Sequence, residues 1–202
     1  MLGLLPSCKS RNTDQPHSIH GRSTTHEDTE RVLKGILPLS TSQTDEKTYR
    51  VAYAVHEFLT SNNQQDAPTR LLGLITLRSL GGSHDLPLPV SLFPPSSTPS
   101  PTVLNVELGY QFLPAAWGKG YATESVNAVF AACRRAAMFW APYEKVYVRA
   151  IVNDENHASL RVMAKTGMTA LGVHVWTGDA VWLAGEWREK CDLHIFGTFL
   201  LE

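Results

Sequence analysis

Three cysteines, few charged residues and no long apolar run limit what this 202-residue chain can be. Cys8, Cys133 and Cys191 are odd in number and widely spaced, which argues against a disulfide framework. Charged residues make up 18% of the chain and the formal net charge is -1, so we expect no nucleic-acid or membrane partner. The longest apolar runs are far too short to span a bilayer. A basic start and a long apolar core, which mark a signal peptide, are missing at the N-terminus, so we expect a cytoplasmic or nuclear protein.

The eight histidines are scattered, and none lies at metal-ligand spacing from cysteines or carboxylates. We therefore predict no metal site. The apolar content of 43% is ordinary for a globular domain, and the chain is long enough to bury one core. We found no internal repeat, so one domain is the simplest organisation.

The chain divides by composition into an N-terminal segment, a domain and an insertion. Residues 1–25 are polar without a clear period and are predicted to be irregular or partly disordered. Residues 26–202 are predicted to form the single domain, beginning with a helix that ends at Pro38. Residues 81–102 are crowded with Pro, Ser and Gly, and are expected to be an inserted, mobile surface loop outside the chemistry.

The periodicity of the domain predicts a mixed α/β sheet. A strand, a helix and a strand follow one another in its middle, which implies a parallel pair with antiparallel neighbours on either side. Apolar stripes predict which helix residues face the core, and we expect Val126, Val129, Phe130, Cys133, Ala137, Leu160, Met163 and Ala164 to do so. The predicted strands are 49–59, 70–80, 103–113, 145–152, 169–176 and 191–199, with a hairpin loop at 62–66 and helices at 124–140 and from Asn156 to Gly167.

A glycine-bearing loop, 113–124, joins the strand at 103–113 to the helix that follows it. Two glycines allow the backbone to approach a ligand closely, and the helix start offers unpaired N–H groups to phosphate oxygens. A Walker loop requires Ser or Thr after Gly118-Lys119, where this chain has Gly120. The dinucleotide fingerprint fits poorly at Thr123 and lacks its acidic residue. A plain tight turn is the remaining alternative for the loop taken alone.

A second motif, Asn156-His157-Ala158-Ser159, follows about thirty residues later and changes the reading of the loop. Together the two motifs resemble the acyl-coenzyme A site of the GNAT acetyltransferase superfamily, from Tyr49 to Phe199. Trp117 stands at the first position of the pyrophosphate loop, where most members have Gln or Arg. The string from Trp117 to Glu124 resembles that of the RimJ/RimL-like branch, the ribosomal-protein N-terminal acetyltransferases. The resemblance implies a GNAT fold, in which a splayed mixed sheet flanked by helices admits acetyl-coenzyme A.

The resemblance also implies roles for individual residues on the donor side. Backbone groups of Gln111, Phe112 and Leu113 are expected to pair with the pantetheine arm. Asn156 is expected to hydrogen-bond that arm, although it is equally suited to be a helix cap. Ser159 is expected to donate a proton to the departing thiolate, and its alternative is a solvated first-turn serine. The pyrophosphate is expected to bind the loop at Trp117, Gly118, Lys119, Gly120, Tyr121 and Ala122.

Glu107 is the candidate proton acceptor. It alternates with Val106 and Leu108, so it lies on the other face of a central strand, where an unpaired carboxylate costs free energy. Family members often carry a carboxylate here that deprotonates the attacking amine. Burial would raise its pKa toward the range that a base needs near neutral pH. The alternative is a salt-bridged glutamate that only orients the substrate.

The predicted function is direct transfer of an acetyl group to a primary amine in a ternary complex. Neither Cys133 nor Cys191 has the setting of a nucleophile, which disfavours an acyl-enzyme. The acceptor is a protein N-terminus or a small amine, and the protein is a monomer or a homodimer. A non-catalytic acyl-coenzyme A sensor or scaffold is the alternative function. Residues 1–10 contain no convincing version of the family's first strand, so that strand is doubtful.

Overall fold

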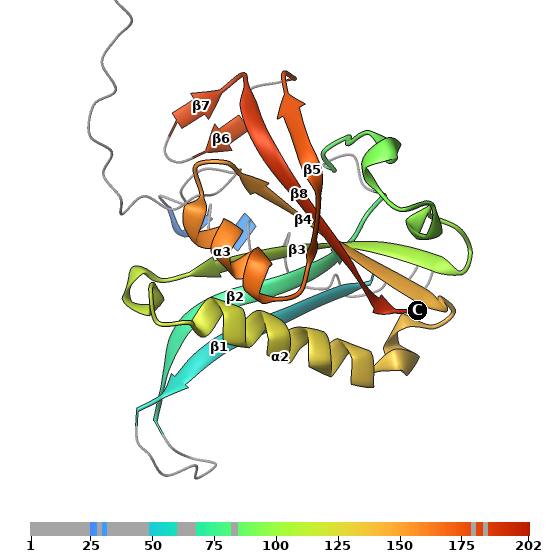
Figure 1. The fold of residues 1–202 in the computed structure, drawn as a ribbon. Helices are drawn as coiled ribbons and strands as arrows, with labels where there is room; N and C mark the ends of the chain where they lie inside the picture. The colour runs from blue at the N-terminus through green and yellow to red at the C-terminus, as the bar shows by residue number, and fades with distance from the viewer. Residues whose placement is uncertain are drawn as a thin grey trace, which may run out of the picture.

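A six-stranded mixed sheet organises the protein, with strand order β1-β2-β3-β4-β8-β5. The computed structural model describes residues 25–27, 30–31, 49–59, 68–81, 85–178, 181–183 and 186–202. A second sheet of two antiparallel strands, β6 and β7, lies near the end of β5 and the start of β8 (Figure 1). The strands are β1 (Arg50–Phe58), β2 (Thr69–Ser79), β3 (Val103–Phe112), β4 (Lys145–Asn153), β5 (Thr169–Trp176), β6 (Val181–Leu183), β7 (Glu186–Arg188) and β8 (Cys191–Leu201). The helices are α2 (Tyr121–Arg135) and α3 (His157–Lys165), with single 3-10 turns at Val90–Leu92, Pro95–Ser97, Pro114–Ala116 and Ala137–Trp140.

The six main strands confirm the strand predictions, which differ from them by one or two residues at the ends. The predicted parallel pair is β3 with β4, and the other four strand pairs of the main sheet are antiparallel. The short strands β6 and β7 were not predicted. Of the predicted first helix, His26, Glu27, Glu30 and Arg31 are helical. The rest of that helix, the N-terminal segment, the doubtful first strand and the 62–66 loop lie outside the described residues.

The predicted bounds of α2 were wrong at both ends. The helix begins at Tyr121, three residues earlier than predicted, because Gly120 takes the left-handed conformation and precedes an uninterrupted helical run. It ends at Arg135, and a 3-10 turn at Ala137–Trp140 continues the chain with a tighter winding. Ala137 is therefore exposed, whereas Trp140 is fully buried and donates its indole N–H to the Cys133 carbonyl at 3.0 Å.

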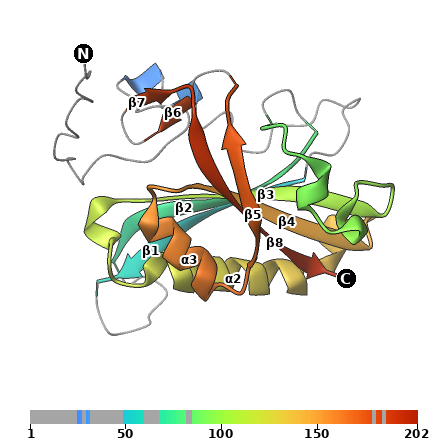
Figure 2. The same cartoon turned by 45° about the horizontal axis from the view of Figure 1, so that its top comes forward.

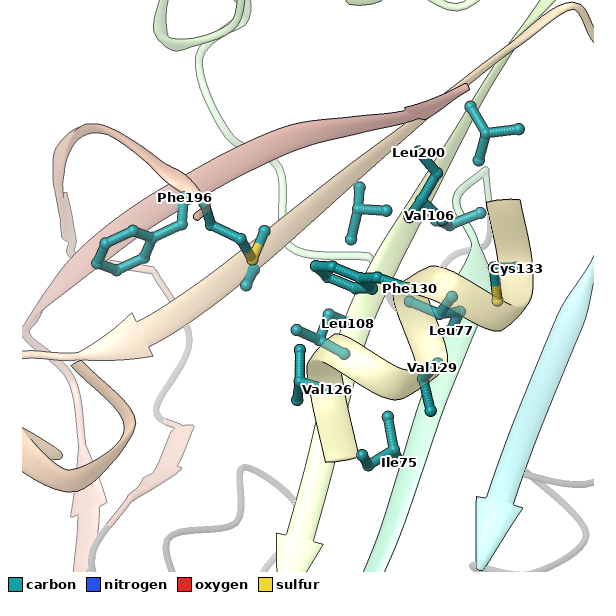
Figure 3. Close-up of a cluster of buried hydrophobic side chains, with 14 of the residues drawn as sticks. Ile75, Leu77, Val106, Leu108, Val126, Val129, Phe130, Cys133, Phe196 and Leu200 are labelled. Atoms are coloured by element: carbon teal, nitrogen blue, oxygen red, sulfur yellow. The ribbon is translucent and has the colours of Figure 1, made fainter. Parts of the chain in front are cut away.

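The main core lies between the sheet and the two helices, which cover the same face (Figure 2). Alternate residues of β2 and β3 point into this core and meet the apolar stripe of α2, as predicted. Figure 3 shows this contact, formed by Ile75, Leu77, Val106, Leu108, Val126, Val129, Phe130 and Cys133. In α3, Met163 is fully buried and Leu160 packs at the margin, but Ala164 is exposed, contrary to the prediction. Residue 164 lies about 100° around the helix from Met163, which turns it outward.

The insertion packs onto the opposite face of the sheet and is not a free surface loop. Its apolar side chains contact a second buried cluster on β8, which is why a Pro- and Ser-rich segment is ordered here. These contacts join Leu86, Leu88, Leu92 and Phe93 to Cys191, Leu193 and Ile195. Ser97 is buried, and its hydroxyl donates to the Pro94 carbonyl at 2.8 Å. Residues 85–102 thus form part of the wall beside the central strands.

The central strands part halfway along their length. β3 and β4 pair from Val103 opposite Lys145 to Glu107 opposite Arg149. Beyond this point β3 continues to Phe112 beside β2, and β4 continues to Asn153 beside β8. The sheet is therefore splayed, as predicted, and the opening lies between the two central strands.

Candidate functional site

The glycine loop lies where β3 ends and α2 begins, at one side of the opening (Figure 1). Gly118 and Gly120 have φ values of 73° and 85°, so both take the left-handed conformation that favours glycine. A Cβ atom built at either position would meet nothing within 4 Å. The backbone conformation therefore requires these glycines, and the space beside them is open.

The start of α2 has backbone N–H groups suited to an anion. Gly120 is its N-cap residue and has no side chain with which to cap the helix. The N–H of Glu124 is the first to bond within the helix, to the Gly120 carbonyl at 3.1 Å. The preceding N–H groups and the helix dipole favour phosphate oxygens. The predicted pyrophosphate-binding residues Gly118–Ala122 are thus brought together at one helix start.

Trp117 ties the loop back to the strand before it. Its indole N–H donates to the Phe112 carbonyl at 2.8 Å, and 40% of the residue is exposed. This contact gives a physical role to a tryptophan at the first position of the loop. It also occupies the Phe112 carbonyl.

Only alternate residues of β3 present their backbone groups to the opening. The Leu113 N–H donates to the Leu72 carbonyl at 2.8 Å, so Leu113 and, by alternation, Gln111 face β2. Phe112 and Tyr110 face the other way, toward the side on which β4 has departed. Of the three residues predicted to meet a pantetheine arm, the structure therefore leaves the Phe112 N–H on that edge.

Asn156 caps α3. Its side-chain oxygen accepts the Ser159 N–H at 3.1 Å, which is the helix-cap alternative for this residue. Ser159 lies in the first turn of α3, beside Tyr110 of β3. Burial raises the pKa of Tyr110, and the neighbouring Ser159 hydroxyl lowers it by a smaller amount. The Tyr110 hydroxyl is buried, and among the described residues it has no partner with regular hydrogen-bond geometry, so Ser159 acts on it only as a near neighbour.

Glu107 occupies the last paired position before the strands part, and its side chain points away from α2. Its Oε2 atom accepts from Arg149, at 2.9 Å from Nε and 2.8 Å from Nη2. Its Oε1 atom lies 3.5 Å from Nη2 of Arg78. Glu107 is 22% exposed and Arg149 only 9%, measured on the side chains. This is the salt-bridged arrangement that the sequence left as an alternative to a free base.

The insertion completes this charged cluster. Arg78 donates to the Asp85 carboxylate at 2.6 Å, and Arg149 donates to the Leu86 carbonyl at 3.4 Å. The sequence analysis missed Arg78, Arg149 and Asp85. Arg78, Glu107 and Arg149 become neighbours through the register of three adjacent strands, which no local pattern reveals. Glu107 points away from α2, whereas Ser159 belongs to α3, which covers the same face as α2. The predicted proton acceptor, Glu107, and the predicted proton donor, Ser159, therefore lie on opposite faces of the parted sheet.

The two described cysteines are buried and belong to the packing. Burial raises the pKa of Cys133 to about 11, and nearby Arg134 offsets this only in part. Cys191 lies in the second cluster, beneath the insertion. Among the described residues no three His, Cys, Asp or Glu side chains gather as metal ligands. The helices within the same residues include none that is long and apolar enough to cross a membrane.

Comparison with protein families places most of the chain in one of them. Residues 10–169 match the model of the acetyltransferase (GNAT) domain. The match begins before the described residues, within the segment that the composition predicts to be irregular. A comparison with curated proteins finds no match.

One solved structure shares the fold, and two others are similar to this chain. A putative phosphinothricin N-acetyltransferase is 16% identical with a TM-score of 0.53, covering 93% of this chain and 84% of its own. A GNAT acetyltransferase from Bacillus anthracis is 22% identical with a TM-score of 0.41, covering 64% of this chain and 59% of its own. Spermidine N-acetyltransferase from Vibrio cholerae, in complex with CoA and spermine, is 18% identical with a TM-score of 0.42, covering 67% of this chain and 62% of its own. This chain therefore spans about six tenths of the length of the last two.

Proposed function

Because this chain belongs to the GNAT acetyltransferase domain family, we propose that it transfers an acetyl group from acetyl-coenzyme A to a primary amine in a ternary complex. The observation that carries the proposal is the glycine loop beside the parted sheet. Two left-handed glycines with open space around them precede a helix whose N-cap residue is a glycine, next to the part of β3 from which β4 has departed. An extended, anionic thioester matches that combination of groups.

The donor would bind along the loop and the free edge of β3. Amides of Gly118–Ala122 would hold the pyrophosphate, and Lys119 would add positive charge. The Phe112 N–H would bond the pantetheine arm as an added strand does. Asn156 already uses its side-chain oxygen as a cap, so its amide N–H group is the part proposed to face the arm.

The reaction would join the two faces of the sheet. The amine nitrogen attacks the thioester carbonyl carbon, the C–S bond breaks, and the product is an amide. Ser159 would donate its proton to the thiolate, and the proton lost by the amine would pass to Glu107 or to water. Buried Cys133 is unsuited to carry the acetyl group, because burial keeps its thiol protonated at neutral pH.

Two acceptor classes follow from this proposal. A protein N-terminus would agree with the RimJ/RimL-like string of the loop, and a small amine is the other class. The wall around Glu107 contains Arg78, Arg149 and Asp85, so an acceptor would meet both charges there. We place the reaction in the cytoplasm or nucleus.

A binding protein without turnover is the second candidate function. The specific observation in its favour is that Glu107 is already paired with Arg149, and that Asn156 caps a helix. Such a protein would bind acetyl-coenzyme A without releasing coenzyme A when amines are added.

One titration and one rate assay test these functions together. Calorimetry with acetyl-coenzyme A measures donor binding by the wild type. Coenzyme A release is then followed with a mixed panel of peptides and small amines. Binding with release supports the acetyltransferase, binding without release across the panel supports the sensor, and no binding contradicts both.

A further inference from the structure

A contact between β1 and the first residue of α2 fixes the glycine loop from outside. The hydroxyl of Tyr121 donates to the Glu57 carboxylate, although the two residues lie 64 positions apart in the chain. Glu57 also forms an ion pair with Arg70 of β2. The Glu57 carboxylate of β1 therefore accepts a hydrogen bond from the start of α2 and forms an ion pair with β2.

The loop needs such a contact. Gly118 and Gly120 give its backbone more conformational freedom than other residues would, and no side chain caps α2. Trp117 ties the beginning of the loop to the end of β3 through the Phe112 carbonyl. Tyr121 ties its end to β1 through Glu57. The two contacts hold the loop at both ends and leave the space beside the glycines open.

The charges around Glu57 keep the contact formed near neutral pH. The hydrogen bonds from Tyr121 and Arg70 lower the pKa of Glu57 most; desolvation opposes them, and the charges of Arg70 and Lys119 add smaller decreases. The hydrogen bond to Glu57 raises the pKa of Tyr121, with Glu124 adding to the effect and Arg70 opposing it. The carboxylate is therefore ionised and the phenol protonated at neutral pH. Arg70 and Lys119 also offset the negative charge that Glu57 places beside an anion site.

We propose that Glu57 and Tyr121 form a latch that holds the first turn of α2 where it binds the anionic part of acetyl-coenzyme A. Glu57 is a positioning residue, because it acts through Tyr121 and is not assigned a contact with the donor. The latch rests on the proposed function, in which α2 begins at the pyrophosphate. It extends the donor site to the edge strand β1, which lies outside both sequence motifs.

Three variants separate the latch from a simple charge effect. Tyr121→Phe removes the hydrogen bond without changing a charge, and Glu57→Gln removes the charge and with it the charge-assisted strength of the bond. Each is expected to weaken acetyl-coenzyme A binding roughly three- to tenfold, the worth of about one hydrogen bond. The double variant is expected to bind like the weaker single variant, because partners in one contact are not additive. Tyr53→Phe is the matched control, because Tyr53 is an exposed tyrosine of β1, the strand that carries Glu57. This variant is expected to bind like the wild type.

Two further readouts distinguish positioning from a loss of fold. At saturating acetyl-coenzyme A the kcat of Glu57→Gln is expected to equal that of the wild type, with the loss confined to the KM for the donor. Amide hydrogen exchange without donor is expected to be faster at Glu124 and the next bonded amides of α2, 125–127, in both latch variants, and unchanged in Tyr53→Phe. Unchanged exchange at the helix start would contradict the latch even if binding changed.

The outcomes also separate the latch from the proposed function. A wild type that fails to bind acetyl-coenzyme A contradicts the proposed function and, with it, the role of the latch in donor binding. A wild type that binds, beside two latch variants that bind equally well, contradicts the latch alone. Tighter binding by Glu57→Gln with unchanged binding by Tyr121→Phe would mean that Glu57 only repels the donor, which also overturns the latch.

Discussion

The two sides of the parted sheet differ in how the sequence encodes them. On the donor side, loop 113–120 and the start of α2 are consecutive in the chain, so a short string of residues and its resemblance to a known family were enough to predict them. On the acceptor side, Arg78, Glu107 and Arg149 come from three strands, and Asp85 comes from the insertion. A loop built from neighbouring residues can be predicted from a single sequence. A group of side chains that come together only through strand register cannot be predicted in this way. This is why the donor is easier to propose than the acceptor.

The largest expected effect on the acceptor side is that of Arg149→Met. Arg149 is 9% exposed in its side chain, and its removal leaves Glu107 without its shortest ion pair. We expect a loss of about 2–3 kcal/mol in the free energy of unfolding, measured by urea denaturation. Arg78→Met is the comparison: Arg78 is 29% exposed, lies 3.5 Å from Glu107 and also pairs with Asp85, and because these pairs are partly exposed we expect it to lose about 1 kcal/mol or less. Equal losses would show that the cluster is not organised around the buried arginine.

The catalytic division between the two faces is tested by Ser159→Ala and Glu107→Gln. Ser159→Ala is expected to lower kcat roughly 100-fold with little change in acetyl-coenzyme A binding, since only the proton transfer is lost. A retained kcat would remove Ser159 from the chemistry.

Glu107→Gln distinguishes the two roles of the carboxylate. A proton acceptor predicts a lower kcat, whereas an orienting group predicts a higher KM for the amine with kcat largely kept. Steady-state rates with any amine accepted by the wild type decide between them. An unchanged kcat and KM would contradict both roles.

The next largest expected effect concerns the insertion. Its packing determines whether it belongs to the wall on the acceptor side. Leu92 packs against the second cluster, and Leu92→Ala is expected to lower the free energy of unfolding by about 2 kcal/mol. Val90→Ala, at a neighbouring residue that is 76% exposed, is the control and is expected to change it little. A matched pair of thermal or urea transitions would test this, and equal stabilities would return the insertion to a free loop.

The smallest expected effect is the pH dependence of the latch. The pKa of Glu57 is lowered from its ordinary value of 4.5, so its stabilising contribution is present above that pH and is lost as the pH falls below it. The pKa of Tyr121 is raised from 10.0, so its contribution is present below pH 10 and is lost as the pH rises further. The difference in thermal stability between wild type and Glu57→Gln is therefore expected to be constant from pH 6 to 9. A difference that changes sign within this range would contradict the protonation states assigned to Glu57 and Tyr121.

The strands were predictable because their apolar alternation is local, and the parallel β3–β4 pair followed from the helix between them. The exposure of Ala137 and Ala164 was not predictable, since alanine fits either side of a helix. At Ala137 the 3-10 turn also changed the direction in which the residue faces. The packing of the insertion was hidden by its Pro and Ser residues, because four spaced apolar side chains decide it. The Glu57–Tyr121 contact joins two distant segments and has no local signature.

The central claim is that the glycine loop binds acetyl-coenzyme A, and one calorimetric comparison tests it most directly. Gly120→Trp fills the open space beside the helix start, whereas Gly167→Trp places the same side chain at a glycine with a similar positive φ and equally open surroundings at the end of α3. Both variants have a comparable backbone cost of roughly 1–2 kcal/mol. The account predicts that Gly120→Trp loses acetyl-coenzyme A binding at least about tenfold while Gly167→Trp stays near the wild type. Unchanged binding by Gly120→Trp would contradict it.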